Sequence, residues 1–208
     1  MKFGLPESFS AVDKVVVLGM GGSAIGADLL SSLAVSEAPI PVLVHRGYSL
    51  PAYVDSQTLV IASSYSGNTE ETLSCFEQSL KVGALNLAIT TGGSLKKIAE
   101  KQDVPVFTIN YKSAPRAALP FSVITLLCFM QKLKLLGNKT TDVRETISVL
   151  RQQAEQLNES VPLSVNQAKQ IARDLDGRLA VIYGAEILSE VAQPTICKHS
   201  NKPKIFLI

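Results

Sequence analysis

The sequence has few charged residues and no segment in which charges of one sign gather. Lys and Arg number 20 and Asp and Glu number 18 among 208 residues, which gives a formal net charge of +2. The basic residues are spread along the chain, whereas a nucleic-acid-binding face needs them clustered. We therefore expect no nucleic-acid partner, and an anionic ligand would need a local site.

Cysteine is equally sparse. The three cysteines, Cys75, Cys128 and Cys197, lie far apart, and the sequence has no CxxC pair and no metal-ligand spacing. An odd, dispersed set in mostly apolar surroundings is typical of reduced thiols in a cytoplasmic protein. We expect neither a disulfide framework nor a metal site.

Long hydrophobic runs are also missing. The N-terminus lacks the basic and apolar parts of a signal peptide. The most apolar stretch, residues 117–130, contains Pro120 and is shorter than the roughly 20 residues that cross a bilayer. We interpret it as a buried core helix and expect no export signal, no membrane partner and a cytoplasmic location.

The chain does have enough apolar sequence for a sizeable core. Hydrophobic residues make up 46% of it and the mean hydropathy is +0.22, which excludes wholesale disorder. Its length exceeds the roughly 100–150 residues of a typical domain without reaching two comfortable ones. One domain plus an extension is therefore expected.

Short β-branched runs alternate with helical patterns, which predicts an α/β fold with a doubly wound parallel sheet of about five strands. Residues 14–18 are expected to form a buried first strand, because three valines follow one another without alternating polar residues. The other strands are expected at 41–44, 58–62, 85–90 and 104–109. Helices are expected at 23–33, 70–81, 94–101 and 116–136, the last ending at Gly137.

The later part of the chain predicts a second unit. A polar helical stretch over 140–158 looks like a connector, and beyond Pro162 the pattern restarts with a helix over 164–175 and a strand over 178–183. We divide the chain into a first domain (1–137), a helical connector (138–162) and the beginning of a second α/β domain (163–208). The apolar run at 205–208 has no evident strand partner.

Two glycine- and hydroxyl-rich loops follow predicted strands. Residues 19–26, Gly-Met-Gly-Gly-Ser-Ala-Ile-Gly, join the first strand to its helix, at the carboxyl edge of the sheet where ligands of open α/β folds bind. Free N–H groups and the helix dipole there make a ready anion site, and Ser23 adds a hydroxyl donor. The alternative is a glycine turn required only by sheet geometry.

The second loop, residues 63–71, holds four Ser and Thr hydroxyls within seven positions. Hydroxyls and backbone amides can satisfy the three oxygens of a phosphate without a lysine. The alternative is a helix cap, with Asn68 capping and Glu71 closing a capping box. A cap leaves the hydroxyls unexplained, so we favour phosphate binding, with Glu70 and Glu71 as first-turn charges that do not contact the ligand.

A dinucleotide fold is the competing interpretation. Gly19, Gly21 and Ala24 fit G-x-G-x-x-G/A, and Arg46 follows the second strand, where a partner of a 2′-phosphate could lie. This predicts an NADP-dependent oxidoreductase but leaves the second loop unexplained.

Three segments together resemble a known family. They are Val-Leu-Gly-Met-Gly-Gly-Ser-Ala-Ile-Gly at 17–26, Ser-Tyr-Ser-Gly-Asn-Thr-Glu-Glu-Thr at 64–72, and Pro115-Arg116 opening an apolar helix. In this order they are similar to the sugar isomerase (SIS) domain of bifunctional phosphoglucose/phosphomannose isomerases. The middle segment alone marks the wider SIS superfamily.

The resemblance implies an aldose-ketose isomerase that interconverts glucose 6-phosphate or mannose 6-phosphate with fructose 6-phosphate through an enediolate, without a cofactor, as a homodimer. It implies a phosphate held by Ser64, Ser66 and Thr69, a sugar contacted by Gly22 and Ser23, and an enediolate stabilised by Arg116. For Arg116, pairing with a nearby carboxylate at a helix start remains the alternative.

The chain departs from this family from about residue 193. The family's Asn-Glu-Asn segment, which carries the catalytic base, has no counterpart, and Glu186, Glu190 and His199 match no motif position. We interpret the chain as a truncated or frame-shifted isomerase whose turnover is impaired because the base is missing. A phosphosugar-sensing SIS module without catalysis is the alternative, although no DNA-binding segment is visible.

Overall fold

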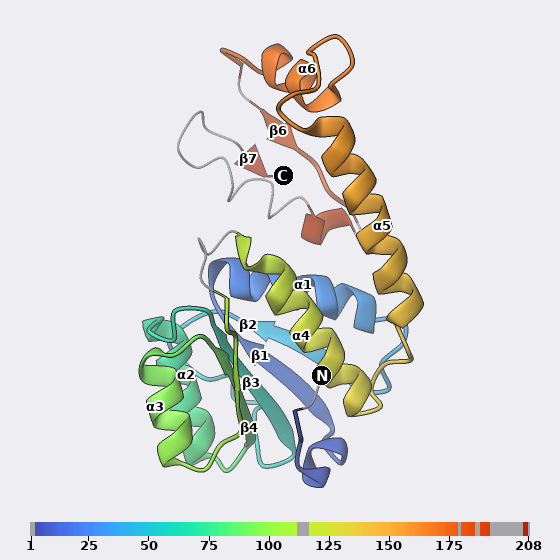
Figure 1. Ribbon diagram of the computed structural model, residues 1–208. Helices are drawn as coiled ribbons and strands as arrows, with labels where there is room; N and C mark the ends of the chain where they lie inside the picture. The colour runs from blue at the N-terminus through green and yellow to red at the C-terminus, as the bar shows by residue number, and fades with distance from the viewer. Residues whose placement is uncertain (1–2, 112–116, 179, 186–187, 192–205, 208) are drawn as a thin grey trace.

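The computed structural model describes residues 3–111, 117–178, 180–185, 188–191 and 206–207. Five parallel strands form one sheet in the order β2-β1-β3-β4-β5, which confirms the predicted fold class (Figure 1). The strands are β1 (Lys14–Leu18), β2 (Val42–His45), β3 (Thr58–Ser64), β4 (Leu85–Thr90) and β5 (Val106–Thr108). Short 3₁₀ helix η1 (Glu7–Ser10) precedes them.

Helices cover both faces of this sheet (Figure 1). They are α1 (Gly21–Ala34), α2 (Glu70–Lys81), α3 (Gly93–Lys101) and α4 (Leu119–Lys132). Val15 and Val17 pack into the core shared with α1 and α4, and Val16 and Leu18 pack into the core shared with α2 and α3. The unbroken valine run is therefore buried on both sides, because successive side chains of a strand point to opposite faces.

Helix α4 ends earlier than the sequence predicts. Its last residue is Lys132, and the left-handed position that ends it is Lys134, with φ of 60°, rather than Gly137. The Leu135 N–H donates to the Met130 carbonyl at 2.9 Å and the Lys134 N–H to Gln131 at 3.1 Å, a Schellman pattern. The predicted end was wrong because burying the leucines beyond Lys132 in the core outweighs the preference for glycine at such a position.

Helix α5 (Thr140–Leu157) extends away from the sheet and leads to α6 (Gln167–Asp174) and β6 (Val181–Ile182) (Figure 1). Neither helix has a buried residue, and Ile171 of α6 and its C-cap residue Leu175 are exposed. Helix α4, by contrast, packs one face against α1 and the sheet, while Phe121 and Ile124 on its other face are exposed.

Strand β7 (Phe206–Leu207) pairs in parallel with β6. The expectation that this apolar run has no partner was therefore wrong, because the pairing joins segments more than 20 residues apart that local pattern cannot connect. Among the described residues, no helix is long and apolar enough to cross a membrane.

The reactivity of Cys75 provides a test of how α2 packs on the sheet. Its side chain is fully buried, its thiol donates to the Gly47 carbonyl at 3.1 Å, and burial raises its pKa. Because the thiolate is the nucleophile, we expect iodoacetamide at pH 8 to modify Cys75 at least about tenfold more slowly than half-buried Cys128. Peptide mass spectrometry measures both rates. They should converge in urea, and equal rates in the native protein would contradict the packing of α2.

Candidate functional site

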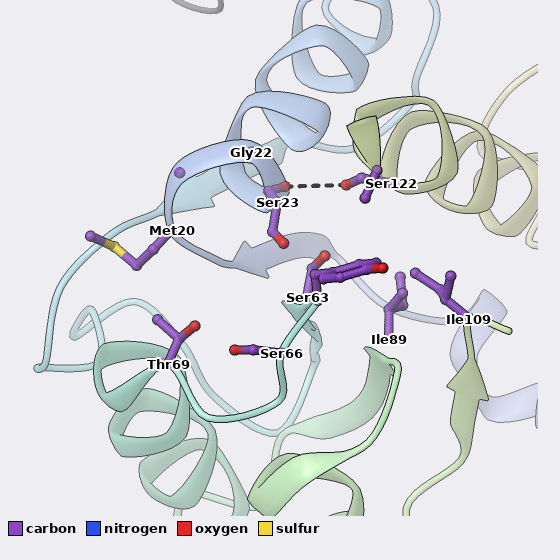
Figure 2. A pocket seen from close by; sticks show the side chains of 12 residues that line it. Met20, Gly22, Ser23, Ser63, Ser66, Thr69, Ile89, Ile109 and Ser122 are labelled. Atoms are coloured by element: carbon purple, nitrogen blue, oxygen red, sulfur yellow. Dashed lines mark hydrogen bonds between the residues drawn. The ribbon is translucent and has the colours of Figure 1, made fainter. Parts of the chain in front are cut away.

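A cavity of about 270 Å³ opens at the carboxyl edge of the sheet. It lies where the strand order reverses between β1 and β3, the switch point at which open α/β sheets bind ligands. Figure 2 shows Ser23 on one side of the space and Ser66 and Thr69 on the other. The lining residues are Met20, Gly21, Gly22, Ser23, Ser63, Tyr65, Ser66, Thr69, Ile89, Ile109, Ala118 and Ser122.

The first predicted loop forms one wall. Helix α1 begins at Gly21, and its N-cap, Met20, provides no side-chain capping bond. A Cβ on Gly19 would lie 3.1 Å from the Ser63 carbonyl oxygen, so the small residue lets this loop approach β3 closely. The N-terminus of α1 thus faces the cavity with its first amides uncapped by any side chain, a favourable place for negative charge.

The second predicted loop forms the facing wall. Gly67 has a φ of 69° and packs so closely on the loop after β4 that a Cβ would lie 1.8 Å from the Gly92 carbonyl oxygen. The Leu95 N–H donates to the Gly67 carbonyl at 2.9 Å, and the Thr91 N–H donates to Tyr65 at 3.1 Å. Contacts with the loop after β4 therefore fix the position of the loop that carries Ser66 and Thr69.

Asn68 belongs to this scaffold. Its side-chain oxygen accepts from the Ser94 N–H at 2.9 Å, at the start of α3. The N-cap of α2 is Thr69, which makes no side-chain capping bond. The capping box suggested for Asn68 and Glu71 is thus wrong, because a contact 26 residues away takes the amide side chain, and the N-terminus of α2 is left without a side-chain cap.

The predicted hydroxyl residues divide into two groups. Gly22, Ser23, Ser66 and Thr69 line the cavity. Ser64 does not: it is 3% exposed, its hydroxyl lies 3.0 Å from that of Thr69, and it accepts from the Gly67 N–H at 3.1 Å. Ser64 therefore fixes the shape of the loop in this structure.

Sequence reasoning missed Ser63, which lines the cavity while only 3% exposed. The missed signal was the alternation of strand side chains, because Ser63 shares a face with Leu59 and Ile61 of β3. The far end of the cavity is apolar, with Ile89, Ile109 and Ala118.

The acidic residues of α2 do not line the cavity. Glu70 accepts from the Tyr48 hydroxyl at 3.3 Å. The charge of Glu71, together with desolvation and the charge of Glu70, raises the pKa of Tyr48. No charged side chain lines the cavity among the described residues, so attraction for an anion there comes from N–H groups, hydroxyls and helix dipoles.

Several predicted residues lie outside the described part of the chain. Arg116 is one of them, as are Glu186 and His199. Arg116 stands two positions before Ala118, which lines the cavity. Just before the segment 112–116, the Tyr111 carbonyl accepts from the Tyr65 hydroxyl at 2.6 Å, and the Tyr111 ring stacks on Phe121 at 4.4 Å.

Arg46, the residue suggested to contact a 2′-phosphate, already pairs with another side chain. Arg46 forms an ion pair with Asp28, which is 8% exposed on α1. A guanidinium that neutralises a buried carboxylate is poorly available to a ligand, so Arg46 does not support the dinucleotide interpretation. Among the described residues, no group of three His, Cys, Asp or Glu side chains could hold a metal ion.

Comparison with known proteins bears on both fold and sequence. Profiles of known families give no match. The tagatose-6-phosphate ketose/aldose isomerase of Escherichia coli has a similar structure, with a TM-score of 0.61 at 17% identity over 94% of this chain and 56% of that chain. At this identity the likeness shows the fold, which is the SIS fold of phosphosugar isomerases.

Two curated proteins are similar to the chain in sequence. A bifunctional phosphoglucose/phosphomannose isomerase of Caldicellulosiruptor bescii is 47% identical over 94% of this chain and 59% of its own length. The enzyme of the same name from Aquifex aeolicus is 31% identical over 93% of this chain and 58% of its own length. The chain is therefore similar to bifunctional phosphoglucose/phosphomannose isomerases over most of its own length, and it spans less than two thirds of the length of these relatives.

Proposed function

We propose that the cavity binds a hexose 6-phosphate and that the protein acts in the interconversion of glucose 6-phosphate or mannose 6-phosphate with fructose 6-phosphate. The observation that carries this proposal is the convergence of two helix N-termini without side-chain caps and the hydroxyls of Ser23, Ser66 and Thr69 on one cavity. Such an arrangement suits a phosphate group. The 47% identity to a phosphoglucose/phosphomannose isomerase supports the choice of substrate.

The two ends of the cavity suggest how the substrate lies. The phosphate would bind at the Ser66 and Thr69 end, where the amides of α2 are uncapped by side chains. The carbon chain would then extend past Ser23 and Gly22 toward Ile89 and Ile109. Fixing the phosphate in this way would hold the reacting carbons in one orientation, which lowers the entropic part of the barrier.

Arg116 would stabilise the intermediate. Removing a proton next to the carbonyl produces an enediolate, and a permanently charged guanidinium lowers the energy of that anion. The position of Arg116 in the chain, two residues from cavity-lining Ala118, supports this role.

The proton transfer itself needs a base that the described cavity does not offer. Among its described lining residues, none has a carboxylate or an imidazole. We therefore propose that this chain binds the phosphosugar and turns it over weakly. Phosphosugar binding would reside in residues 1–137, with 138–162 as a connector and 163–208 as the beginning of a second SIS domain.

A coupled assay tests this proposal together with calorimetry. Fructose 6-phosphate should bind at a single site, and a dehydrogenase that consumes glucose 6-phosphate should report slow product formation. Replacing Arg116 by glutamine should lower that rate by about 100-fold, because it removes a donor aimed at the developing charge. Tight binding of NADP without binding of fructose 6-phosphate would refute the proposal.

A further inference from the structure

Ser63 is 3% exposed and lines the cavity, and its hydroxyl makes no hydrogen bond to another described residue. Neighbouring buried hydroxyls are paired: Ser64 with Thr69, and Ser79 with Phe76 and Asn86. Buried polar groups in proteins are almost always hydrogen-bonded, and an exception calls for a specific reason. The Ser63 hydroxyl opens onto the cavity, where a ligand can bond to it. The Thr72 hydroxyl also lacks a partner, but it is buried away from this cavity.

The position of Ser63 in the sheet makes its polarity unusual. It continues the face of β3 that carries Leu59 and Ile61, and its partner in the parallel register is Ile89 of β4. An aliphatic side chain would continue this apolar layer without adding a polar atom that needs a hydrogen bond. Serine here instead places a hydroxyl on the wall of the cavity, where it can donate to and accept from a ligand.

The location of Ser63 within the cavity indicates which part of a ligand it meets. It lies between the polar loop of Ser66 and Thr69 and the apolar end at Ile89 and Ile109 (Figure 2). The phosphate end is already supplied with hydroxyls and with amides that no side chain caps. Ser63 thus faces the space that the carbon chain of a phosphosugar would occupy, and a serine hydroxyl both donates to and accepts from sugar oxygens.

We propose that the Ser63 hydroxyl binds an oxygen of the sugar carbon chain and makes the cavity selective for phosphosugars over phosphate itself. This inference rests on the proposed function, since it takes the phosphate to lie at the Ser66 loop. It assigns to ligand recognition a hydroxyl that no described residue engages.

Calorimetry on the S63A variant tests the assignment with two probes, fructose 6-phosphate and inorganic phosphate. We expect the affinity for fructose 6-phosphate to fall about five- to tenfold, the effect of one hydrogen bond. The affinity for inorganic phosphate should stay unchanged, and the melting temperature should stay equal or rise. The control is S79A, which removes a hydroxyl that is fully buried away from the cavity and bonded to Phe76 and Asn86. This variant should melt lower and bind both probes as the wild type does.

The outcomes separate this inference from the proposed function. Equal loss of affinity for both probes would place Ser63 at the phosphate and overturn its role in selectivity. Unchanged affinity for fructose 6-phosphate would overturn it too, while the proposed function would stand. If the wild type binds neither probe, the proposed function fails and the inference falls with it.

Discussion

Replacing Gly67 by alanine is expected to destabilise the protein and to abolish phosphosugar binding. The Cβ would lie 1.8 Å from the Gly92 carbonyl oxygen, and the residue would keep a φ of 69°. The left-handed conformation costs about 1–2 kcal/mol, and forcing backbone apart adds about 1–3 kcal/mol. A total of about 3 kcal/mol corresponds to a fall of roughly 10 °C in melting temperature for a chain of this size.

Gly83 provides the matched control for this substitution. It has a φ of 76°, and nothing lies within 4 Å of a Cβ built there. The G83A variant therefore carries the conformational cost alone, about 1–2 kcal/mol, and should bind fructose 6-phosphate normally. Thermal unfolding and calorimetry on the two variants measure the difference. If they melt and bind alike, Gly67 is not held against the Gly92 loop as described.

A carboxylate at position 66 is expected to eliminate phosphosugar binding without unfolding the protein. Ser66 is exposed, lines the cavity and accepts from the Asn68 N–H at 3.2 Å. Aspartate can make the same local turn bond, but its charge would face the phosphate. Like charges in contact cost several kcal/mol, so the S66D variant should bind fructose 6-phosphate at least about 100-fold more weakly.

The control here is S66N, which keeps the turn bond and nearly the same shape without the charge. Calorimetry should show only a few-fold loss for this variant, and both variants should melt within about 2 °C of the wild type, as surface substitutions do. Equal binding by the Asp and Asn variants would mean that the phosphate lies elsewhere.

The sheet and both loops were predictable because their signals are local. The valine run of β1 predicts a strand that is buried on both faces, and the strand is so buried. Helix α2 and strand β4 begin and end at the predicted residues. The loop positions follow from the strands, since ligands of such folds bind at the carboxyl ends. The lining of the cavity by Gly22, Ser23, Ser66 and Thr69 agrees with where the sequence placed a site.

The features that were not predicted depend on contacts distant in sequence. Asn68 holds the start of α3 instead of capping α2, and β7 finds its partner in β6. Helix α4 ends at Lys132 because the leucines that follow are drawn into the core. Ser63 was counted in the second loop but not assigned to the ligand, because the strand was expected to end at Ala62 and the alternation that turns Ser63 toward the cavity was not extended to it.

The most direct measurement of the central claim is a residue-resolved amide chemical-shift titration with fructose 6-phosphate. If both loops bind one phosphosugar, amides of residues 21–23 and 66–71 should shift together and saturate at the same ligand concentration, while residues of α5 stay unchanged. Shifts confined to one loop, or no shifts at concentrations where NADP perturbs the same amides, would contradict the account.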